Sequence, residues 1–432
     1  MQPATVIAAA RFGFGRRPQD PEPADPRAWL AGQVAAPAPA PALPEGHPAT
    51  LREIFALQAE DNETMRAGQG RPHQQRIWRA EAAAHLALAA TEEAGFRERL
   101  VHFWANHFTV GRQKVPYTVG HFIRDAIRPH VTGRFEAMLL AVIRHPAMLA
   151  YLDNATSIGP DSRAGQRSGR GLNENLAREI LELHTVTPAA GYTQADVGAL
   201  ARIITGWSFA PQREPFGFLF RPAAHEPGEK RLLGRTFPEG EAGGVEALAF
   251  LARHPATQRH LATKLARHFV ADTPPPIAVR RIEAALRDSG GDLGAAARAL
   301  VALPEAWDPP LSKLRPPTDY VLAVLRALAA PPAVAERAVG TLQYLGQPVW
   351  NARAPIGWPD AAAEWASPEA MLRRVEWANG LAARGAERDA AGLAEAVLGP
   401  LARPETLRAA ARAGSAREAL TLVVTSPEFH RR

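Results

Sequence analysis

The chain has 432 residues, of which 46% are hydrophobic and 22% are charged; its formal net charge is +6, and it contains no cysteine. The absence of cysteine excludes disulfides, thiolate catalysis and cysteine-bound metal. The positive charge comes from scattered arginines and not from a basic stripe with interleaved aromatics, which argues against nucleic-acid binding. No apolar run is long enough to span a membrane, and residues 1–18 lack the charged and apolar regions of a signal peptide. A cytoplasmic location is therefore expected, or a periplasmic one if a partner carries the protein there.

Composition divides the chain into three regions. Residues 1–34 form an N-terminal segment in which Gly13 and Gly15 precede a short helix. This glycine pair is not a nucleotide-binding motif, because no strand precedes it and no third glycine follows at the required spacing. Residues 35–48 alternate proline with alanine and predict a semi-rigid linker. The abundance of Ala, Leu and Arg predicts that residues 49–432 form a single large, mainly α domain of orthogonal or bundle-like helices.

The first candidate site residues lie at the end of a long helical region, residues 51–113. In the helix expected over residues 96–108, Phe103 and His107 share one arc, whereas His102 and Asn106 share another. His107 thus lies among apolar neighbours. Two interpretations stay open: a core histidine bonded to a carbonyl group, or one member of a shared polar site.

The densest run of functional groups lies at residues 173–185, which read NENLAREILELHT. Asn175, Arg178, Glu179 and Glu182 fall on one arc of this predicted helix, and His184 falls in the middle of the apolar arc. If the polar arc is solvated, its charges form i,i+4 pairs worth only about 0.2–0.5 kcal/mol each. If the arc is buried, the same residues form a desolvated network of the kind that is typical of functional sites.

The rest of the pattern is helical, with one exception. Thr193 and Asp196 have the spacing of an N-cap and its N3 partner, so a helix is expected to begin there. Residues 216–221 alternate like a strand, a turn follows at His225, and residues 231–237 return, which predicts one small β-hairpin over about 214–237. Further helices are broken by a Pro/Trp-rich loop over about 347–365. Its tryptophans either cap the core or, if exposed, form a platform for a ligand.

Several phrases occur in a specific order along the chain: RFGFG at residues 11–15, FWANHF at 103–108, HPAML at 145–149, NEN at 173–175, ELHT at 182–185, YTQADV at 192–197, TGW at 205–207 and SPEF at 426–429. With this ordered set, the chain resembles the bacterial family called domain of unknown function 1800 over nearly its whole length. The resemblance implies a mostly helical bacterial protein. It also suggests a partner, because members are often encoded beside a protein of the domain of unknown function 1501 family, which is similar to alkaline phosphatases and sulfatases. The family has no settled activity, so the resemblance implies no mechanism.

Two hypotheses about function follow. In the first, the protein is an enzyme with a buried site, a hydrolase that uses either a divalent metal or metal-free acid–base chemistry. Its catalytic candidates are His107, Asn106, Asn175, Arg178, Glu179, Glu182 and His184. Its metal-ligand candidates are His102, His184, Glu179, Asp153 and His225. The sequence contains no HExxH zinc motif and no nucleophile elbow, which leaves the cofactor unknown. In the second hypothesis, the protein is a non-catalytic partner or escort of the co-encoded phosphatase- or sulfatase-like protein.

Overall fold

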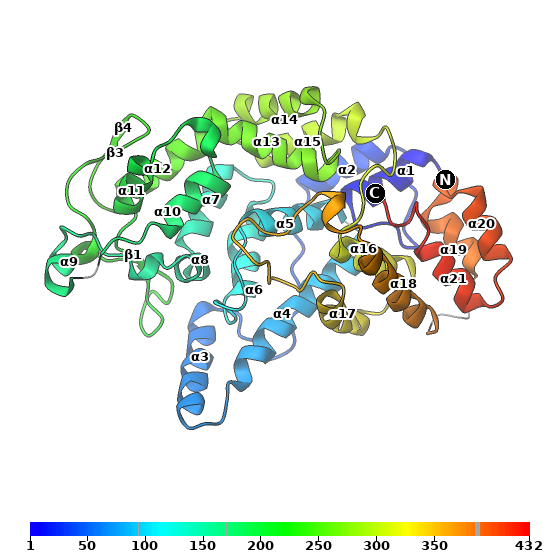
Figure 1. Cartoon of the computed structure of the whole chain (residues 1–432), viewed down its shortest axis with the longest axis horizontal. Coiled ribbons are helices and arrows are strands. Elements are labelled where there is room, and N and C mark those ends of the chain that lie inside the picture. Colours follow the sequence, from blue (N-terminus) through cyan, green and yellow to red (C-terminus); the bar gives the residue numbers. More distant parts are fainter. Residues whose placement is uncertain (94, 170, 385–388) are drawn as a thin grey trace.

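The helix α5 (Gly95–His107) runs through the centre of the molecule (Figure 1). The computed structural model describes residues 1–93, 95–169, 171–384 and 389–432. Ten of the 13 residues of α5 are buried, and they include charged side chains as well as apolar ones. Glu98 pairs with Arg128, and Arg99 pairs with Asp319, so these charges find their partners inside the protein. The helix expected over residues 96–108 is therefore confirmed, with an interior that is partly polar.

The N-terminal segment packs into the same interior. It contains α1 (Pro3–Ile7), a π-helical turn (Ala8–Phe12) and α2 (Pro26–Ala35). Phe12 joins the main hydrophobic cluster together with the apolar residues of α5. The Pro/Ala segment after α2 lies against the body of the protein, because Arg97 donates to the carbonyl of Ala36 (2.7 Å) and Arg128 to that of Pro39 (3.1 Å).

The next helices are α3 (Leu51–Arg66), α4 (Pro72–Thr91), α6 (Val119–Phe122), α7 (Phe135–Arg144) and α8 (Pro146–Tyr151). Helices α3 and α4 form a pair that projects from the body in Figure 1. A histidine followed by proline starts α8, and the same pair starts α13 (Pro255–Phe269). His145 Nδ1 accepts the backbone N–H of Ala147, and His254 Nδ1 accepts that of Ala256, each at 3.1 Å. These histidines are N-caps, because they satisfy a backbone donor that the helix itself leaves free.

The region on the left of Figure 1 contains α9 (Arg163–Ser168), α10 (Asn175–Glu179) with its π-helical continuation (Ile180–His184), and α11 (Gln194–Ile203). The capping box of Thr193 and Asp196 is confirmed. The strands differ from the prediction in their partners. β1 (Trp207–Phe209) pairs with β2 (Phe218–Phe220), and β3 (Lys230–Leu232) pairs with β4 (Arg235–Phe237), both antiparallel. The second pair is joined by a turn at Leu233 and Gly234, which both have positive φ, as a two-residue turn of type I′ requires.

Helices α12 (Glu241–Arg253), α13, α14 (Pro276–Asp288) and α15 (Leu293–Ala302) form a layer along the top of Figure 1. The C-terminal helices are α16 (Pro317–Ala327), α17 (Pro332–Tyr344), α18 (Pro368–Ala382), α19 (Ala390–Val397), α20 (Pro404–Ala411) and α21 (Ala416–Val424). α17 packs on α4, and Arg431 pairs with Leu314 in an isolated bridge just before α16. The mainly α class is confirmed. In the part of the chain that the structure describes, no helix is both long and apolar enough to cross a membrane.

Candidate active site

We call α10 with its π-helical continuation, residues 175–184, the central helix, and its polar arc faces outward. Asn175 and Glu182 are exposed, and Arg178 and Glu179 are partly buried. Arg178 pairs with Glu174 at 3.1 Å, as expected for an i,i+4 pair. Burial raises the pKa of the Glu179 carboxyl, and the nearby Glu182 raises it further. These carboxylates therefore do not meet the histidines on the opposite side of the helix.

The histidines do meet each other. The ring centroids of His107 and His184 lie 6.0 Å apart, and His260 of α13 lies at the same distance from His107. His107 Nε2 donates to the carbonyl of His184 (3.2 Å), and His260 Nε2 donates to that of Leu183 (3.0 Å). Burial lowers the pKa of His184 to about 3 and that of His260 to about 4, so these rings are neutral. Two of these rings bond main-chain carbonyls, neither ring nitrogen of His184 has a hydrogen-bond partner among the described residues, and the cluster contains no carboxylate.

The five metal-ligand candidates occupy separate places. Asp153 pairs with Lys114 at 2.7 Å on the surface. His225 Nδ1 donates to the carbonyl of Thr205 (2.9 Å), and its Nε2 accepts the N–H of Gly240 (2.9 Å), so both ring nitrogens have protein partners. Glu179 and His184 lie on different sides of the central helix, and His102 lies on α5.

Among the described residues, one group has three ligand atoms close enough for a metal ion: His121, Asp125 and His145. Because His145 Nδ1 accepts the N–H of Ala147, its neutral ring carries a proton on Nε2. That N–H donates to His121 Nδ1 at 3.0 Å. A hydrogen bond therefore accounts for the close approach of the two rings, and it leaves His145 Nε2 without a lone pair for a cation.

A cavity of about 140 Å³ lies between α4, α5, the end of α13, the start of α16 and residues 347–360, which we call the roof segment. Two of the predicted residues, His102 and Asn106, line this cavity. Its lining includes the apolar side chains of Val101, Phe122, Ile123, Val349, Trp350 and Trp358. Its lining also includes the polar side chains of His85, Arg99, His102, His268, Asp319 and Asp360.

Asn106 holds the roof segment on the cavity. Its Oδ1 accepts the N–H of Trp358 (2.7 Å), and its Nδ2 donates to the Trp358 carbonyl (2.9 Å). At the other end of the segment, Gln347 Oε1 accepts the N–H of Thr318 (2.7 Å). The carbonyl of Trp350 accepts the N–H of Arg112 (2.8 Å). The Pro/Trp-rich loop is thus a fixed wall of the cavity, and Asn106 is a positioning residue.

His268, in the last turn of α13, forms the closest contact between a histidine and a carboxylate in the cavity wall. Its Nδ1 donates to Asp360 Oδ1 at 2.6 Å. Burial lowers the pKa of His268 to about 4, although Asp360 opposes this shift. The neutral ring therefore has its proton on Nδ1 and its lone pair on Nε2, which accepts a long hydrogen bond from Arg99 Nη1 (3.5 Å). Burial alone would raise the pKa of Asp360, but His268, Arg432 and Lys313 together hold it well below its usual range.

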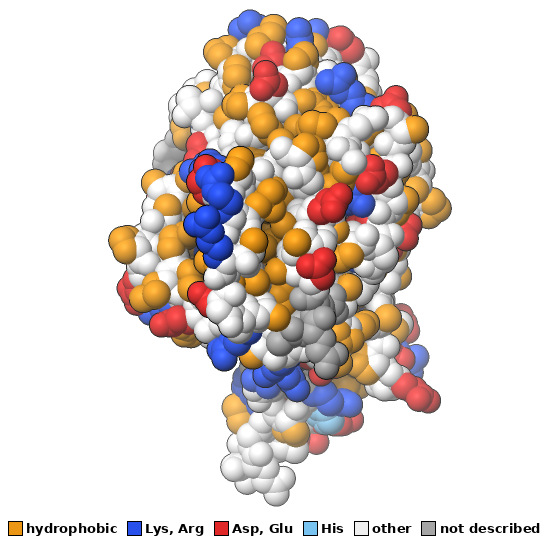
Figure 2. Space-filling view, turned by 90° about the vertical axis from the view of Figure 1, so that its right-hand side faces the viewer, with side chains coloured by type: hydrophobic (Ala, Val, Ile, Leu, Met, Phe, Trp, Pro, Cys, Tyr) orange, Lys and Arg blue, Asp and Glu red, His pale blue; other side chains and the backbone are white. Residues whose placement is uncertain are grey.

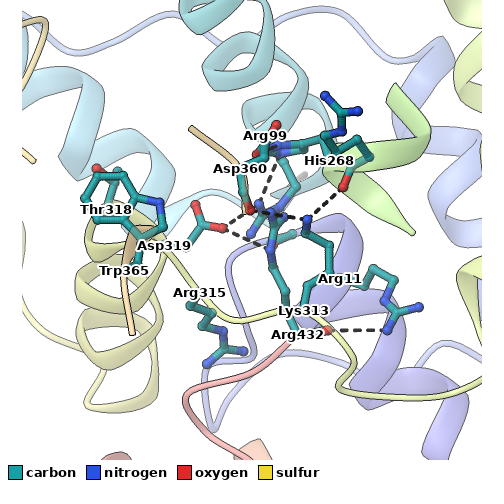
Figure 3. Close-up of polar contacts among 12 residues, drawn as sticks. Arg11, Arg99, His268, Lys313, Arg315, Thr318, Asp319, Asp360, Trp365 and Arg432 are labelled. Atoms are coloured by element: carbon teal, nitrogen blue, oxygen red, sulfur yellow. Dashed lines mark hydrogen bonds and ion pairs between the residues drawn. The ribbon is translucent and has the colours of Figure 1, made fainter. Parts of the chain in front are cut away.

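Behind this pair lies a network of buried ions, shown in Figure 3. Asp319 accepts a hydrogen bond from Arg99 Nη1 at 2.8 Å and pairs with Arg432 Nε at 3.3 Å. Lys313 Nζ pairs with Asp272 at 2.5 Å. Burial alone would raise the pKa of Asp319, but Arg99 and Arg432 keep it well below its usual range. The carboxylate of Asp319 is therefore ionised and neutralised by protein cations.

Sequence reasoning missed His268, Asp360, Asp319 and Arg99 as site residues. One local signal was present: His260, Lys264 and His268 recur every four residues, which places three basic side chains on one face of α13. Burial lowers the pKa of Lys264 to about 8. This stripe contrasts with the apolar face that an ordinary packed helix presents.

Fold and site together define a mainly α protein whose interior encloses a charged cavity with tryptophans in its roof. The chain belongs to the family described as "Protein of unknown function (DUF1800)", whose model matches residues 7–431. The resemblance seen in the sequence is thereby confirmed. Neither curated proteins nor solved structures gave a match to the chain.

Proposed function

We propose that the protein is a hydrolase that uses metal-free acid–base chemistry and that the cavity beneath the roof segment is its active site. The observation that carries the proposal is the buried contact of 2.6 Å between His268 Nδ1 and Asp360 Oδ1, in the wall of a cavity that also contains tryptophans. A carboxylate bonded to one ring nitrogen fixes the tautomer and leaves the other nitrogen as a proton acceptor. His268 is thus the proposed catalytic residue, and Asp360 positions it.

The proposed reaction is the attack of water on an electrophilic carbon or phosphorus atom of a bound substrate. His268 Nε2 takes one proton from the water as its oxygen forms the new bond, and Asp360 stabilises the imidazolium. The same proton then passes from Nε2 to the leaving group as the bond to that group breaks. One water molecule is consumed, and the histidine returns to its neutral form.

The metal-free version of the reaction is proposed because both carboxylates in the cavity wall already pair with protein cations or with a histidine. Asp319 is paired with Arg99 and Arg432, and Asp360 is paired with His268. A divalent cation would have to displace these protein cations to reach either carboxylate.

The test is a screen of aryl esters, aryl amides and aryl phosphates with the wild-type protein and two variants. We expect His268→Gln to lower the turnover of the accepted substrate by about 10²- to 10⁴-fold, which is the usual contribution of a general base. The matched control is His260→Gln, because His260 lies on the same helix but bonds a main-chain carbonyl outside the cavity. The proposal fails if the wild type turns over no substrate class, or if His268→Gln stays within twofold of the control.

The pH profile offers a second readout. Because burial holds the pKa of His268 at about 4, the base is already unprotonated in mildly acidic solution. We therefore expect kcat/KM to be flat between about pH 6 and 8, instead of rising through the ordinary histidine pKa of about 6.5.

A second candidate function is binding of a protein partner, and one surface feature favours it. An apolar hollow of about 720 Å³ lies between α19, α20 and α21, lined largely by alanines and by the exposed Leu407. Figure 2 shows hydrophobic side chains gathered on the face where these helices lie. The natural partner to test is the co-encoded phosphatase- or sulfatase-like protein that the family resemblance suggests. Co-purification that is lost in Leu407→Glu would support this candidate, and separate elution of the two wild-type proteins would remove it.

A further inference from the structure

Two side chains that line the cavity, those of His85 and Arg99, each have a buried N–H donor without a hydrogen-bond partner in the described part of the chain. The first belongs to His85 on α4, which is buried. Arg128 Nη2 lies 3.3 Å from His85 Nδ1, and because arginine can only donate, Nδ1 is the acceptor. The proton of this neutral ring is therefore on Nε2. That nitrogen is buried and has no hydrogen-bond partner among the described residues.

The second donor belongs to Arg99 on α5. Its Nε donates to the carbonyl of Gly13 (2.7 Å), and its Nη1 donates to Asp319 (2.8 Å). The guanidinium also stacks over the ring of Phe14 at 4.5 Å. These contacts fix the plane of the group, while Nη2 stays buried and without a partner in the described part of the chain. A buried donor without a hydrogen-bond partner is destabilising, and a ligand that supplies an acceptor removes this cost.

The surrounding charges also favour a negative ligand. The network around Arg99 contains the buried cations Arg11, Arg99, Lys313, Arg315 and Arg432. Its carboxylates are the buried Asp319 and the partly buried Asp272 and Asp360. The cations outnumber the carboxylates among these residues. Arg315 Nη1 donates to the carbonyl of Phe429 and pairs with no carboxylate among the described residues.

We propose that the ligand of this cavity is a small molecule with an apolar body and an oxyanion, either a carboxylate or a phosphate. Arg99 Nη2 binds the oxyanion, and His85 Nε2 donates to a second oxygen of the ligand. The apolar body lies against the apolar lining residues, among them Val101, Phe122 and Trp350. This inference rests on the proposed function, because it names the substrate class of the same site.

The test uses three probes with one shared ring: benzoate, phenyl phosphate and the neutral benzamide. Binding to the full-length protein is measured by isothermal titration calorimetry. We expect at least one anion to bind at least about tenfold more tightly than benzamide, and the tighter anion identifies the group that the site prefers. Arg99→Lys should weaken anion binding about tenfold or more, because lysine cannot keep both the Asp319 pair and a second directed donor. Arg326→Lys is the control, since Arg326 is equally buried but lies outside the cavity wall.

His85→Phe keeps the inference falsifiable if Arg99→Lys does not fold. Phenylalanine preserves the ring that packs on Trp350 and removes the donor, so anion binding should weaken while benzamide binding stays the same. Equal binding of benzamide and the anions would overturn the inference, as would unchanged anion binding in either variant. The same titrations on His268→Gln separate the two proposals, because this variant should lose turnover and still bind the anion. If His268→Gln loses turnover but the wild-type protein binds the anions no more tightly than benzamide, the proposed function stands and the proposed substrate class is refuted.

Discussion

Replacing Gly357 by alanine should release the roof of the cavity. Gly357 has φ +81°, and a Cβ atom there would lie 2.4 Å from the carbonyl oxygen of Asn106 and 2.6 Å from its Oδ1. Gly346, just before the roof segment, has φ +84°, but a Cβ there would meet no atom within 4 Å. The two glycines thus both have positive φ, and they differ in whether a neighbouring residue occupies the position of the added Cβ atom.

The expected magnitudes follow from this difference. Alanine at positive φ is destabilising by about 1 kcal/mol, and this applies to both positions. At position 357, the new methyl group must also push Trp358 away from Asn106. The two hydrogen bonds between them are then lost, each worth about 1 kcal/mol net. We therefore expect the free energy of unfolding to fall by about 3 kcal/mol in Gly357→Ala and by about 1 kcal/mol in Gly346→Ala.

Two measurements check this prediction. Urea denaturation gives the free energies of unfolding, and hydrogen exchange gives the protection of the Trp358 amide, which should be lost in Gly357→Ala only. If Gly357→Ala is no less stable than Gly346→Ala, and Trp358 stays protected, Asn106 does not fix the roof segment.

Two further predictions concern the buried charges. Burial lowers the pKa of His102, His260 and His268 to about 4 and that of His184 and His430 to about 3. In the unfolded chain these rings protonate near pH 6.5, so between about pH 6.5 and 4 the unfolded state binds more protons, and stability is lost as the pH falls. From pH 6.5 to about 5 we expect each histidine to lower the free energy of unfolding by up to about 2 kcal/mol. A total decrease of less than about 2 kcal/mol in urea titrations would contradict this prediction. The second prediction is that Asp319→Asn leaves Arg99 and Arg432 without their shared carboxylate and is destabilising by about 3–5 kcal/mol. Asp288→Asn, which breaks an exposed pair with Arg287, should change stability by less than about 0.5 kcal/mol, and equal effects of the two variants would refute the reasoning.

Helices were predictable from the sequence because their signals are local. The period of apolar residues, the Thr193 cap and the His-Pro junctions each lie within a few residues of the structure that they specify. The strand-like stretches at 218–220 and 230–237 were also predictable, but their partners were not, because strand pairing is set by turn geometry and by contacts outside the strand itself.

The cavity was not predictable, because its contacts join residues that are far apart in the chain. Arg99 and Asp319 are 220 residues apart, His268 and Asp360 are 92 apart, and Asn106 and Trp358 are 252 apart. No periodicity links such pairs. The helix pattern predicts His102 and Asn106 as site residues. The carboxylates expected beside them, however, come from α16 and the roof segment instead of the central helix.

The histidines show why a local pattern could not separate structural from candidate catalytic residues. His145 and His254 cap the first turns of helices, where backbone N–H groups lack partners. His107 and His260 instead donate to backbone carbonyls at the end of the central helix. Its last carbonyls, those of Leu183 and His184, are free because the helix stops there, and each accepts a histidine N–H from 77 residues away.

A histidine that bonds a backbone group left unpaired at a helix end is fixed in one tautomer by that bond, without a carboxylate partner. His268, which lines the cavity, differs because its Nδ1 donates to a carboxylate and its Nε2 accepts Arg99 Nη1 at 3.5 Å. A carboxylate partner stabilises the protonated ring, which a neutral carbonyl does much less strongly. His268 is therefore distinguished from these histidines by its carboxylate partner and not by its pKa, because burial lowers the pKa of His260 and of His268 alike to about 4.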